Sequence, residues 1–396
     1  MGPPLNIDCN GYREVTGYSV IRKVWAKTPP GLRPVLRQVG QITLQVVSWP
    51  VINRWPRYSR LFLMDDSASW SISWDMRELA MIAQRIGVQV ADVCWLSAAR
   101  NQAVFYGSQF ALLDESWLKR PLRVGLAYFH GRPGTGVLEF DKSYERLCQI
   151  HHRIHRVQVS HSEMREVVLS SGIVPEKVFL IPIGINLSYF SPQTAESRRS
   201  ARAKLGIPQS AVVVGSFQKD GVGWGEGMEP KLIKGPDVFL RTIGFLKQRV
   251  PELFVLLSGP ARGYVKAGLE RLGVPYRHTF LKHYPEVGQL FQGLDVYIIS
   301  SRQEGGPKAV LEAMATGVPL VTTRVGQAMD LVRHGENGWM VEIDDAEGLA
   351  HWAEYVISHR SSLGDVLRTG RQAAEANSYD AQIPLWESFM KGFVEW

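Results

Sequence analysis

The chain has 396 residues, of which 45% are hydrophobic and 21% are charged, and its formal net charge at neutral pH is +7. This length suits two domains of moderate size. The number of cysteines, 3, is odd and they are widely spaced, which argues against a disulfide scaffold and fits a reducing cytoplasm. No stretch approaches the roughly 20 apolar residues that span a bilayer, and we see no apolar core of a secretory leader at the start.

Residues 1–59 are basic and carry tryptophan. No acidic residue lies between Glu14 and Asp65, whereas the same span holds eight cations: Arg22, Lys23, Lys27, Arg33, Arg37, Arg54, Arg57 and Arg60. Several prolines break any long helix there. Three readings stay open: an appendage with solvated charges, peripheral contact with an anionic membrane, and a nucleic-acid surface.

Residues 60–66 form an apolar run that predicts a first parallel strand. A loop rich in Ser and Trp follows, and Asp75 is predicted to cap a helix that ends at Gly87. Residues 88–90 begin the next strand. This order of strand, loop, helix and strand is typical of a Rossmann-like domain.

A second apolar strand at 122–129 ends at His130, which is either a site residue at the strand end or a histidine bonded to the backbone. Residues 143–156 are predicted to form a helix rich in His and Arg. Its His151 and His155 have the spacing of a metal-binding pair, but we find no Cys or acidic ligand that completes a set with them, so we expect no metal. Ser160 is predicted to start a further helix.

The polar stretch 191–202 is predicted to be a linker. A strand at 211–216 opens the second domain, and Lys219, an inserted loop at 222–229 and the pair Lys234-Gly235 follow it. We expect the inserted loop to form a flap at the cleft. Lys219 is read either as a ligand of a diphosphate or as a solvated loop charge.

The most informative segment is Glu304-Gly305-Gly306-Pro307-Lys308, followed by Glu312 on a short apolar helix. The buried strand 294–301 precedes it, so Glu304 is expected in a loop at the carboxyl end of a parallel strand, where ligands of open α/β sheets bind. The free N–H groups at the start of the helix favour an anion. A glutamate in such a place can also be a simple helix cap.

The run from Leu294 to Ala350 resembles family 4 of the retaining glycosyltransferases with the GT-B fold. Glu304 and Glu312 match the family's E-x7-E signature, residues 335–338 match its "GENG" turn, and residues 177–190 resemble the passage that ends its first domain. Two departures stand out. The arginine that usually follows the first strand of the second domain is missing, and the glycine-rich loop near residue 67 is replaced by serines and tryptophan.

The resemblance implies an α/β protein with two Rossmann-like domains whose parallel sheets face a cleft. We assign residues 60–195 to an acceptor domain, completed by a terminal helix in 376–396, and residues 196–375 to a nucleotide-sugar donor domain. Residues 1–59 lie outside the resemblance.

The resemblance also implies a hexosyltransferase (class EC 2.4) that retains the anomeric configuration and needs no metal or other cofactor. Glu304 and His130 are the expected catalytic residues. Seven residues are expected to bind the donor: Lys219, Lys234, Gly305, Gly306, Pro307, Lys308 and Glu312. The partners are a nucleotide-diphosphate sugar and a saccharide or lipid-linked acceptor, in polysaccharide, lipopolysaccharide or glycoconjugate synthesis.

Other classes stay open at this point. One is a GT-B enzyme such as a nucleotide-sugar hydrolase, an epimerase or a phosphorylase. The other is a non-catalytic scaffold that binds membrane or nucleic acid through residues 1–59. The expected location is the cytoplasm or the inner face of the membrane. The donor base, the sugar, the acceptor and the oligomeric state cannot be read from the sequence.

Overall fold

The computed structural model describes residues 55–65, 71–93, 96, 99–114 and 116–396. Residues 56–93 and 101–396 form one unit that holds every element discussed below, and residues 1–55 and 94–100 belong to another. The predicted N-terminal extension and the serine-rich loop at 66–70 therefore lie almost entirely outside the described residues.

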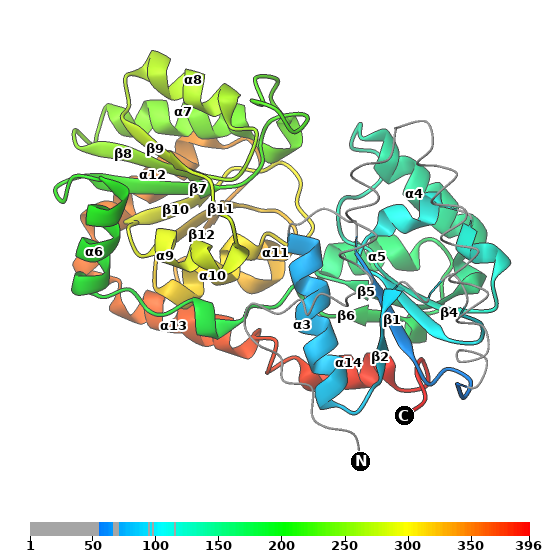
Figure 1. Ribbon diagram of the computed structural model, residues 1–396. Coiled ribbons are helices and arrows are strands. Elements are labelled where there is room, and N and C mark those ends of the chain that lie inside the picture. The colour runs from blue at the N-terminus through cyan, green and yellow to red at the C-terminus, as the bar shows by residue number, and fades with distance from the viewer. Residues whose placement is uncertain (1–54, 66–70, 94–95, 97–98, 115) are drawn as a thin grey trace, which may run out of the picture. The chain divides into compact units, whose positions relative to one another are not determined.

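Twelve strands in the described part of the chain form two sheets of six, and all strand pairs within the sheets are parallel (Figure 1). The first sheet has the order β2-β1-β3-β4-β5-β6, and the second has the order β12-β11-β10-β7-β8-β9. The strands of the first sheet are β1 (Leu61–Met64), β2 (Val90–Ala91), β3 (Ala103–Tyr106), β4 (Arg123–Ala127), β5 (Ile154–Val159) and β6 (Val178–Leu180). Those of the second are β7 (Val212–Phe217), β8 (Leu253–Ser258), β9 (Tyr276–Thr279), β10 (Val296–Ile299), β11 (Leu320–Thr323) and β12 (Trp339–Val341).

Helices connect the strands, as parallel pairing requires. The described helices are α3 (Ser71–Arg85), α4 (Leu138–Ile150), α5 (Ser162–Leu169), α6 (Ala195–Leu205), α7 (Pro236–Lys247), α8 (Gly263–Leu272), α9 (Val287–Phe291), α10 (Lys308–Thr316), α11 (Ala328–Leu331), α12 (Ala346–Ser358), α13 (Gly364–Ala376) and α14 (Ile383–Met390).

The second sheet is covered on both faces. Every residue of β8 and β10 is buried, which explains why both strands read as unbroken apolar runs. One apolar cluster includes Leu311 and Met314 of α10 with Phe291 of α9, and the other includes Phe239 of α7 with Leu349 of α12. Figure 1 shows α7 and α8 on one side of this sheet and α9 and α10 on the other.

The strand order of the second sheet reverses between β7 and β10. The chain runs outward from β7 to β8 in one direction and from β10 to β11 in the other, so the connections after these neighbouring strands diverge. Such a topological switch point is where ligands bind in open α/β sheets. The loops that carry Lys234 and Glu304 follow β7 and β10, so the topology brings them to one edge.

The last helix of the chain packs against the first sheet. Phe389 of α14 is fully buried and makes edge contacts with Phe105 of β3 and Phe179 of β6, at ring-centroid distances of 5.5 and 5.1 Å. A Cβ on Gly125 would lie 3.0 Å from the ring of Phe393, so β4 leaves room for the terminal segment. The terminal segment thus packs on β3, β4 and β6.

Four local predictions were wrong. The predicted helix at 143–156 ends at Ile150 as α4, and a strand begins at Ile154, so His151 and His155 never share a helical face. Helix α3 begins at Ser71, so Asp75 lies inside it instead of capping it.

The two others concern polar residues. Ser160 does not cap α5, which begins at Ser162; its hydroxyl instead donates to the carbonyl of Gly305 at 2.9 Å. The predicted linker at 191–202 contains the start of α6, where Thr194 and Ser197 form a reciprocal cap. In both places a distant or local hydrogen bond, which the pattern of apolar residues does not report, decides the structure.

Candidate functional site

An ion pair lies at the switch point of the second sheet. Lys234 Nζ is 2.5 Å from Glu304 Oε2, and the side chain of Glu304 is only 12% exposed. The Ser301 hydroxyl donates to Glu304 Oε1 at 2.9 Å. The lysine on the β7 side and the carboxylate on the β10 side therefore meet, as their strand ends predict, and both oxygens of Glu304 are held.

Glycine is required on both sides of this pair. Gly235 has a φ of +60°, and a Cβ there would lie 1.9 Å from the carbonyl oxygen of Ser300. A Cβ on Gly305 would lie 1.9 Å from the carbonyl oxygen of Phe129. The glycines let the two loops and the end of β4 approach closely, which fixes the backbone around Lys234 and Glu304.

Helix α10 follows this loop with its amino end at Lys308. Among the described residues no acceptor takes the N–H groups of Gly305 and Gly306, and the first-turn amides of a helix have no intrahelical partner. The helix ends at Gly317, which has a φ of +65° and donates its N–H to the carbonyls of Ala313 and Met314. The amides at the amino end are suited to an anionic or hydroxyl-bearing ligand.

Glu312 is buried on the same helix, all of whose residues from Val310 to Thr316 are buried. The hydroxyl of Tyr284 donates to Glu312 Oε1. Burial raises the pKa of Glu312 to about 7, although the hydrogen bond from Tyr284 and the charge of Lys308 act in the opposite direction. Tyr284 in turn packs against Trp74 at a centroid distance of 5.5 Å. Tyr284 thus links the Glu312 carboxylate to the Trp74 ring.

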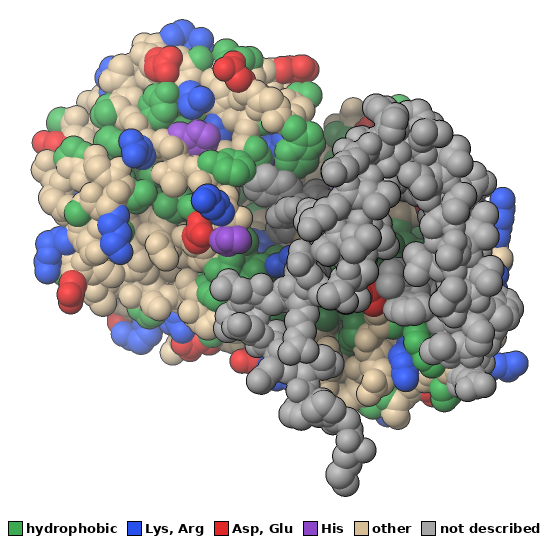
Figure 2. All heavy atoms as spheres, in the orientation of Figure 1, with side chains coloured by type: hydrophobic (Ala, Val, Ile, Leu, Met, Phe, Trp, Pro, Cys, Tyr) green, Lys and Arg blue, Asp and Glu red, His purple; other side chains and the backbone are tan. Residues whose placement is uncertain are grey.

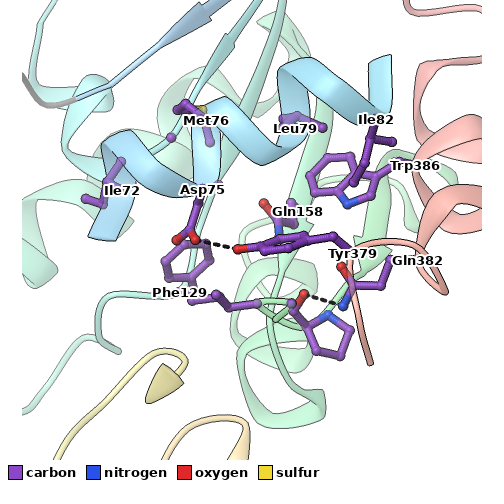
Figure 3. Close-up of a pocket in the computed structure, with 15 residues that line it drawn as sticks. Ile72, Asp75, Met76, Leu79, Ile82, Phe129, Gln158, Tyr379, Gln382 and Trp386 are labelled. Carbon is purple, nitrogen blue, oxygen red and sulfur yellow. Dashed lines mark hydrogen bonds between the residues drawn. The ribbon is translucent and has the colours of Figure 1, made fainter. Parts of the chain in front are cut away.

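The side chain of Lys308 turns toward helix α3. Its ammonium pairs with Asp75, and it lies 3.2 Å from the hydroxyl of Tyr379, which itself donates to Asp75 at 2.6 Å. Figure 3 shows the carboxylate of Asp75 on α3 joined to the hydroxyl of Tyr379. Both residues line a small cavity of about 20 Å³, which is too small for a sugar. The ammonium of Lys308 is therefore paired with Asp75 of α3, whereas its backbone begins α10 directly after the loop of Glu304.

His130 lies at the end of β4 with its imidazole stacked on Phe110, at a centroid distance of 5.3 Å. Its Nε2 is buried, with no hydrogen-bond partner among the described residues. Burial lowers the pKa of His130 to about 4, and the charges of Lys234 and Lys231 lower it further. The ring is therefore neutral near pH 7, and its pKa depends on the charges of Lys231 and Lys234.

Lys219 is half-buried, and its ammonium lies 4.5 Å from the centre of the Trp224 ring in the inserted loop. The inserted loop is closed at its base by a hydrogen bond from the Val222 N–H to the Glu229 carbonyl, at 2.9 Å. Sequence reasoning missed Ser301, Tyr284, Asp75 and Tyr379 as partners of the predicted residues. Only Ser301, which ends the predicted strand with a small polar side chain, carried a local signal.

The described residues include no group of three or more His, Cys, Asp or Glu side chains arranged to hold a metal ion. Their helices are all too short or too polar to cross a bilayer. On the face seen in Figure 2, Lys and Arg side chains of the described residues are scattered among acidic and apolar ones and do not gather in one patch.

Two parallel Rossmann-like sheets, with an ion pair at the switch point of the second, define the two-domain GT-B fold. Residues 225–359, which include Lys234, Glu304 and Glu312, match the model of the family described as "Glycosyl transferases group 1". The crystal structure of Anabaena Alr3699/HepE in complex with UDP-glucose is similar, with a TM-score of 0.66 and 16% identity, over 84% of this chain and 99% of that one. Sucrose-phosphate synthase from Thermosynechococcus elongatus gives a TM-score of 0.59 at 18% identity, over 80% of this chain and 77% of that one.

Curated relatives carry the same class of name. The D-inositol 3-phosphate glycosyltransferase of Corynebacterium urealyticum is 30% identical over 236 residues, which are 55% of this chain and 50% of that protein. The protein of the same name from Mycobacterium tuberculosis is 29% identical over 235 residues, 57% of this chain and 44% of that protein. The chain thus matches about half the length of these relatives.

Proposed function

We propose that this protein is a glycosyltransferase that moves a hexose-type sugar from a nucleoside-diphosphate sugar to an acceptor hydroxyl, with retention at the anomeric carbon. The observation that carries the proposal is the pair Lys234–Glu304 at the switch point. It is followed directly by the amides of Gly305 and Gly306, which have no acceptor among the described residues. The match to the group 1 glycosyl transferases and the GT-B fold support it. We place donor binding in residues 196–375 and acceptor binding in residues 60–195 with the terminal segment 376–396.

Each donor residue has a proposed role. Lys234 neutralises the diphosphate, and Glu304 bonds hydroxyls of the donor sugar. The N–H groups of Gly305, Gly306 and Lys308 hold the sugar or its phosphate. Pro307 fixes the backbone at the start of α10. Glu312 bonds the ribose hydroxyls, which then take the place of the Tyr284 hydroxyl as donors to the carboxylate.

The chemistry needs no covalent intermediate on the protein. As the glycosidic bond breaks, negative charge grows on the departing diphosphate, and a cation that is held close lowers the barrier. The leaving phosphate then takes the proton of the attacking acceptor hydroxyl on the same face of the sugar. His130 is neutral, so its Nε2 is suited to exchange one hydrogen bond with the sugar or the acceptor.

The finer assignment is also a proposal. We place the protein in the retaining family 4 and its product in polysaccharide, lipopolysaccharide or glycoconjugate synthesis, in the cytoplasm or at the inner face of the membrane. UDP is the first nucleotide to test, because similar crystal structures contain UDP-glucose or UDP. A hydroxyl-rich acceptor fits the name of the curated relatives. We propose a saccharide or a lipid-linked acceptor of this kind.

The test is a thermal-shift panel of UDP, GDP, ADP, TDP and CMP, each with and without Mg²⁺. A ligand that binds only the folded protein stabilises it by roughly 2.7 kcal/mol at 100 times its dissociation constant. We expect one diphosphate to raise the melting temperature without Mg²⁺ and to lose this effect in Lys234→Ala and Glu304→Ala. If no nucleotide shifts the wild type, the proposal is wrong.

The stereochemical part has its own test. The product formed from the matching α-linked nucleotide sugar and a simple acceptor is examined by proton NMR of its anomeric proton. Retention predicts an α-linked product, and a β-linked product contradicts it. Free sugar released without acceptor indicates a hydrolase instead.

A further inference from the structure

The residue that replaces the missing family arginine is not evident from the sequence, where Lys219 is the nearest cation in the chain. The structure offers a second candidate, Lys231, which lies just before the 3-10 helix Leu232–Lys234. Its carbonyl accepts the N–H of Lys234 at 2.8 Å, so the two lysines flank a single turn. Both lysines therefore belong to the segment that connects β7 to α7.

Lys231 is half-buried and has no carboxylate or other hydrogen-bond partner for its ammonium among the described residues. The charges of Lys234, Lys219, Glu304 and Glu139 act on the pKa of Lys231, and the charges of Lys231 and Lys234 lower the pKa of His130. Burial is the larger cause that lowers the pKa of Lys231, and the neighbouring lysines add to it. Lys231 is therefore inside the basic group around Glu304.

The charges of this group do not balance. Lys219, Lys231 and Lys234 contribute three positive charges, Glu304 and Glu139 contribute two negative charges, and His130 is neutral. An excess positive charge in a half-buried site is unfavourable without a counter-ion, and a bound anion relieves the repulsion. A diphosphate supplies such an anion.

The inserted loop holds Lys231 in place. The Lys231 N–H donates to the Asp220 carbonyl at 2.8 Å. Asp220 forms a fully buried ion pair with Arg262 at 3.0 Å. Gly227 of the loop lies against Ala261, where a Cβ would be 2.2 Å from the carbonyl oxygen. The loop is therefore anchored on the turn after β8, and the segment that follows the loop holds the backbone of Lys231 in a fixed position.

We infer that Lys231 is the second cation of the donor diphosphate site and that Lys219, engaged by the ring of Trp224, lies at its rim. This inference rests on the proposed function and assigns one more residue to it. It makes the inserted loop, which departs from the family pattern, part of the phosphate site.

Isothermal titration with UDP and with UMP tests the inference, because only UDP carries the β-phosphate. The variants are Lys231→Ala, Lys231→Arg and Lys219→Ala, with the exposed Lys204→Ala as the control and the melting temperature of each as a check on folding. We expect Lys231→Ala to lose at least tenfold in UDP affinity and less than twofold in UMP affinity, Lys231→Arg to retain most of the UDP affinity, and Lys219→Ala to lose less than threefold.

The outcomes separate the two claims. Absence of UDP binding to the wild type, together with absence of binding of GDP, ADP and TDP, overturns the proposed function. UDP binding to the wild type that is unchanged in Lys231→Ala overturns only the inference, and so does an equal loss of UDP and UMP affinity, which would indicate a structural role. A selective loss in Lys219→Ala instead assigns the role to that lysine.

Discussion

At the scale of single residues, the site depends on titratable groups that are held in unusual surroundings. Glu312 is a carboxyl inside a buried helix, and His130 is an imidazole stacked on an aromatic ring with its Nε2 unpaired. Burial favours the neutral form of both groups, but this moves their pKa values in opposite directions. Their effects on stability therefore have opposite dependences on pH.

Glu312→Gln should stabilise the protein above pH 7. The folded state raises the pKa of Glu312 from 4.5 to about 7, so the folded protein holds a proton that the unfolded chain releases. The free energy of unfolding therefore falls as pH rises through this window, by at most ~1.4 kcal/mol per pH unit from this group. Melting curves of both proteins at pH 5 and pH 8 measure the effect. A difference between them that does not change with pH contradicts the assignment.

His130→Gln should remove a loss of stability in acid. The folded state lowers the pKa of His130 from 6.5 to about 4, so the unfolded chain binds the extra proton first. The contribution of a neutral His130 is complete above pH 6.5 and is lost as pH falls toward 4, again by at most ~1.4 kcal/mol per pH unit. Chemical denaturation measures the free energy of unfolding at pH 7 and pH 5. Between these two values it should fall more for the wild type than for the variant. Parallel slopes for the two proteins would count against a neutral buried His130.

At the scale of elements, the loop before α10 and the end of α10 use glycine for different reasons. Gly305 is needed because three backbone segments meet: its carbonyl accepts from Ser160 and from the Gln327 N–H, and the carbonyl of Phe129 occupies the space of a Cβ. Gly317 is needed only for its left-handed backbone, with nothing within 4 Å of a Cβ. The first glycine belongs to the site, whereas the second belongs to the helix.

Gly305→Ala should therefore lower stability by about 3 kcal/mol and abolish nucleotide binding, because a backbone atom cannot move aside as a side chain can. Gly317→Ala at the other end of the same helix is the matched control. It should cost about 1 kcal/mol and leave nucleotide affinity within about twofold. Denaturant unfolding and the nucleotide titration measure both. Normal binding by Gly305→Ala would remove this loop from the proposed site.

At the scale of the whole molecule, buried polar contacts connect elements of the two sheets. The Gln327 side chain accepts the N–H of Ile183, after β6, at 2.9 Å. Lys308 of α10 pairs with Asp75 of α3. These groups satisfy one another across the two halves of the fold, so separating them leaves buried partners unpaired at about 1–3 kcal/mol each.

We expect the wild type to unfold in one calorimetric transition and the double variant Asp75→Ala/Gln327→Ala to unfold in two, as the first and second sheets lose their coupling. The control is Arg368→Ala, which removes an exposed pair with Asp365 within one helix and should leave a single transition. Scanning calorimetry distinguishes the cases. A single transition in the double variant would show that these contacts do not couple the sheets.

The sequence by itself determined the parts of this protein that are encoded locally. The apolar run 294–301 predicted a buried parallel strand, and the Gly-Gly-Pro turn after Glu304 predicted a loop and a short helix at its end. Both rest on periodicity and turn residues, which need only neighbours in the chain. Local patterns failed where a polar side chain had a distant partner, as for Ser160 and Asp75.

Only the tertiary structure decided which side chains contact the predicted residues. Tyr284 meets Glu312 across 28 positions, and Asp75 meets Lys308 across 233. The choice between Lys219 and Lys231 likewise depends on how the inserted loop packs on the turn after β8. The reason is physical: a strand order places loops side by side, and no spacing along the chain reports which loops these are.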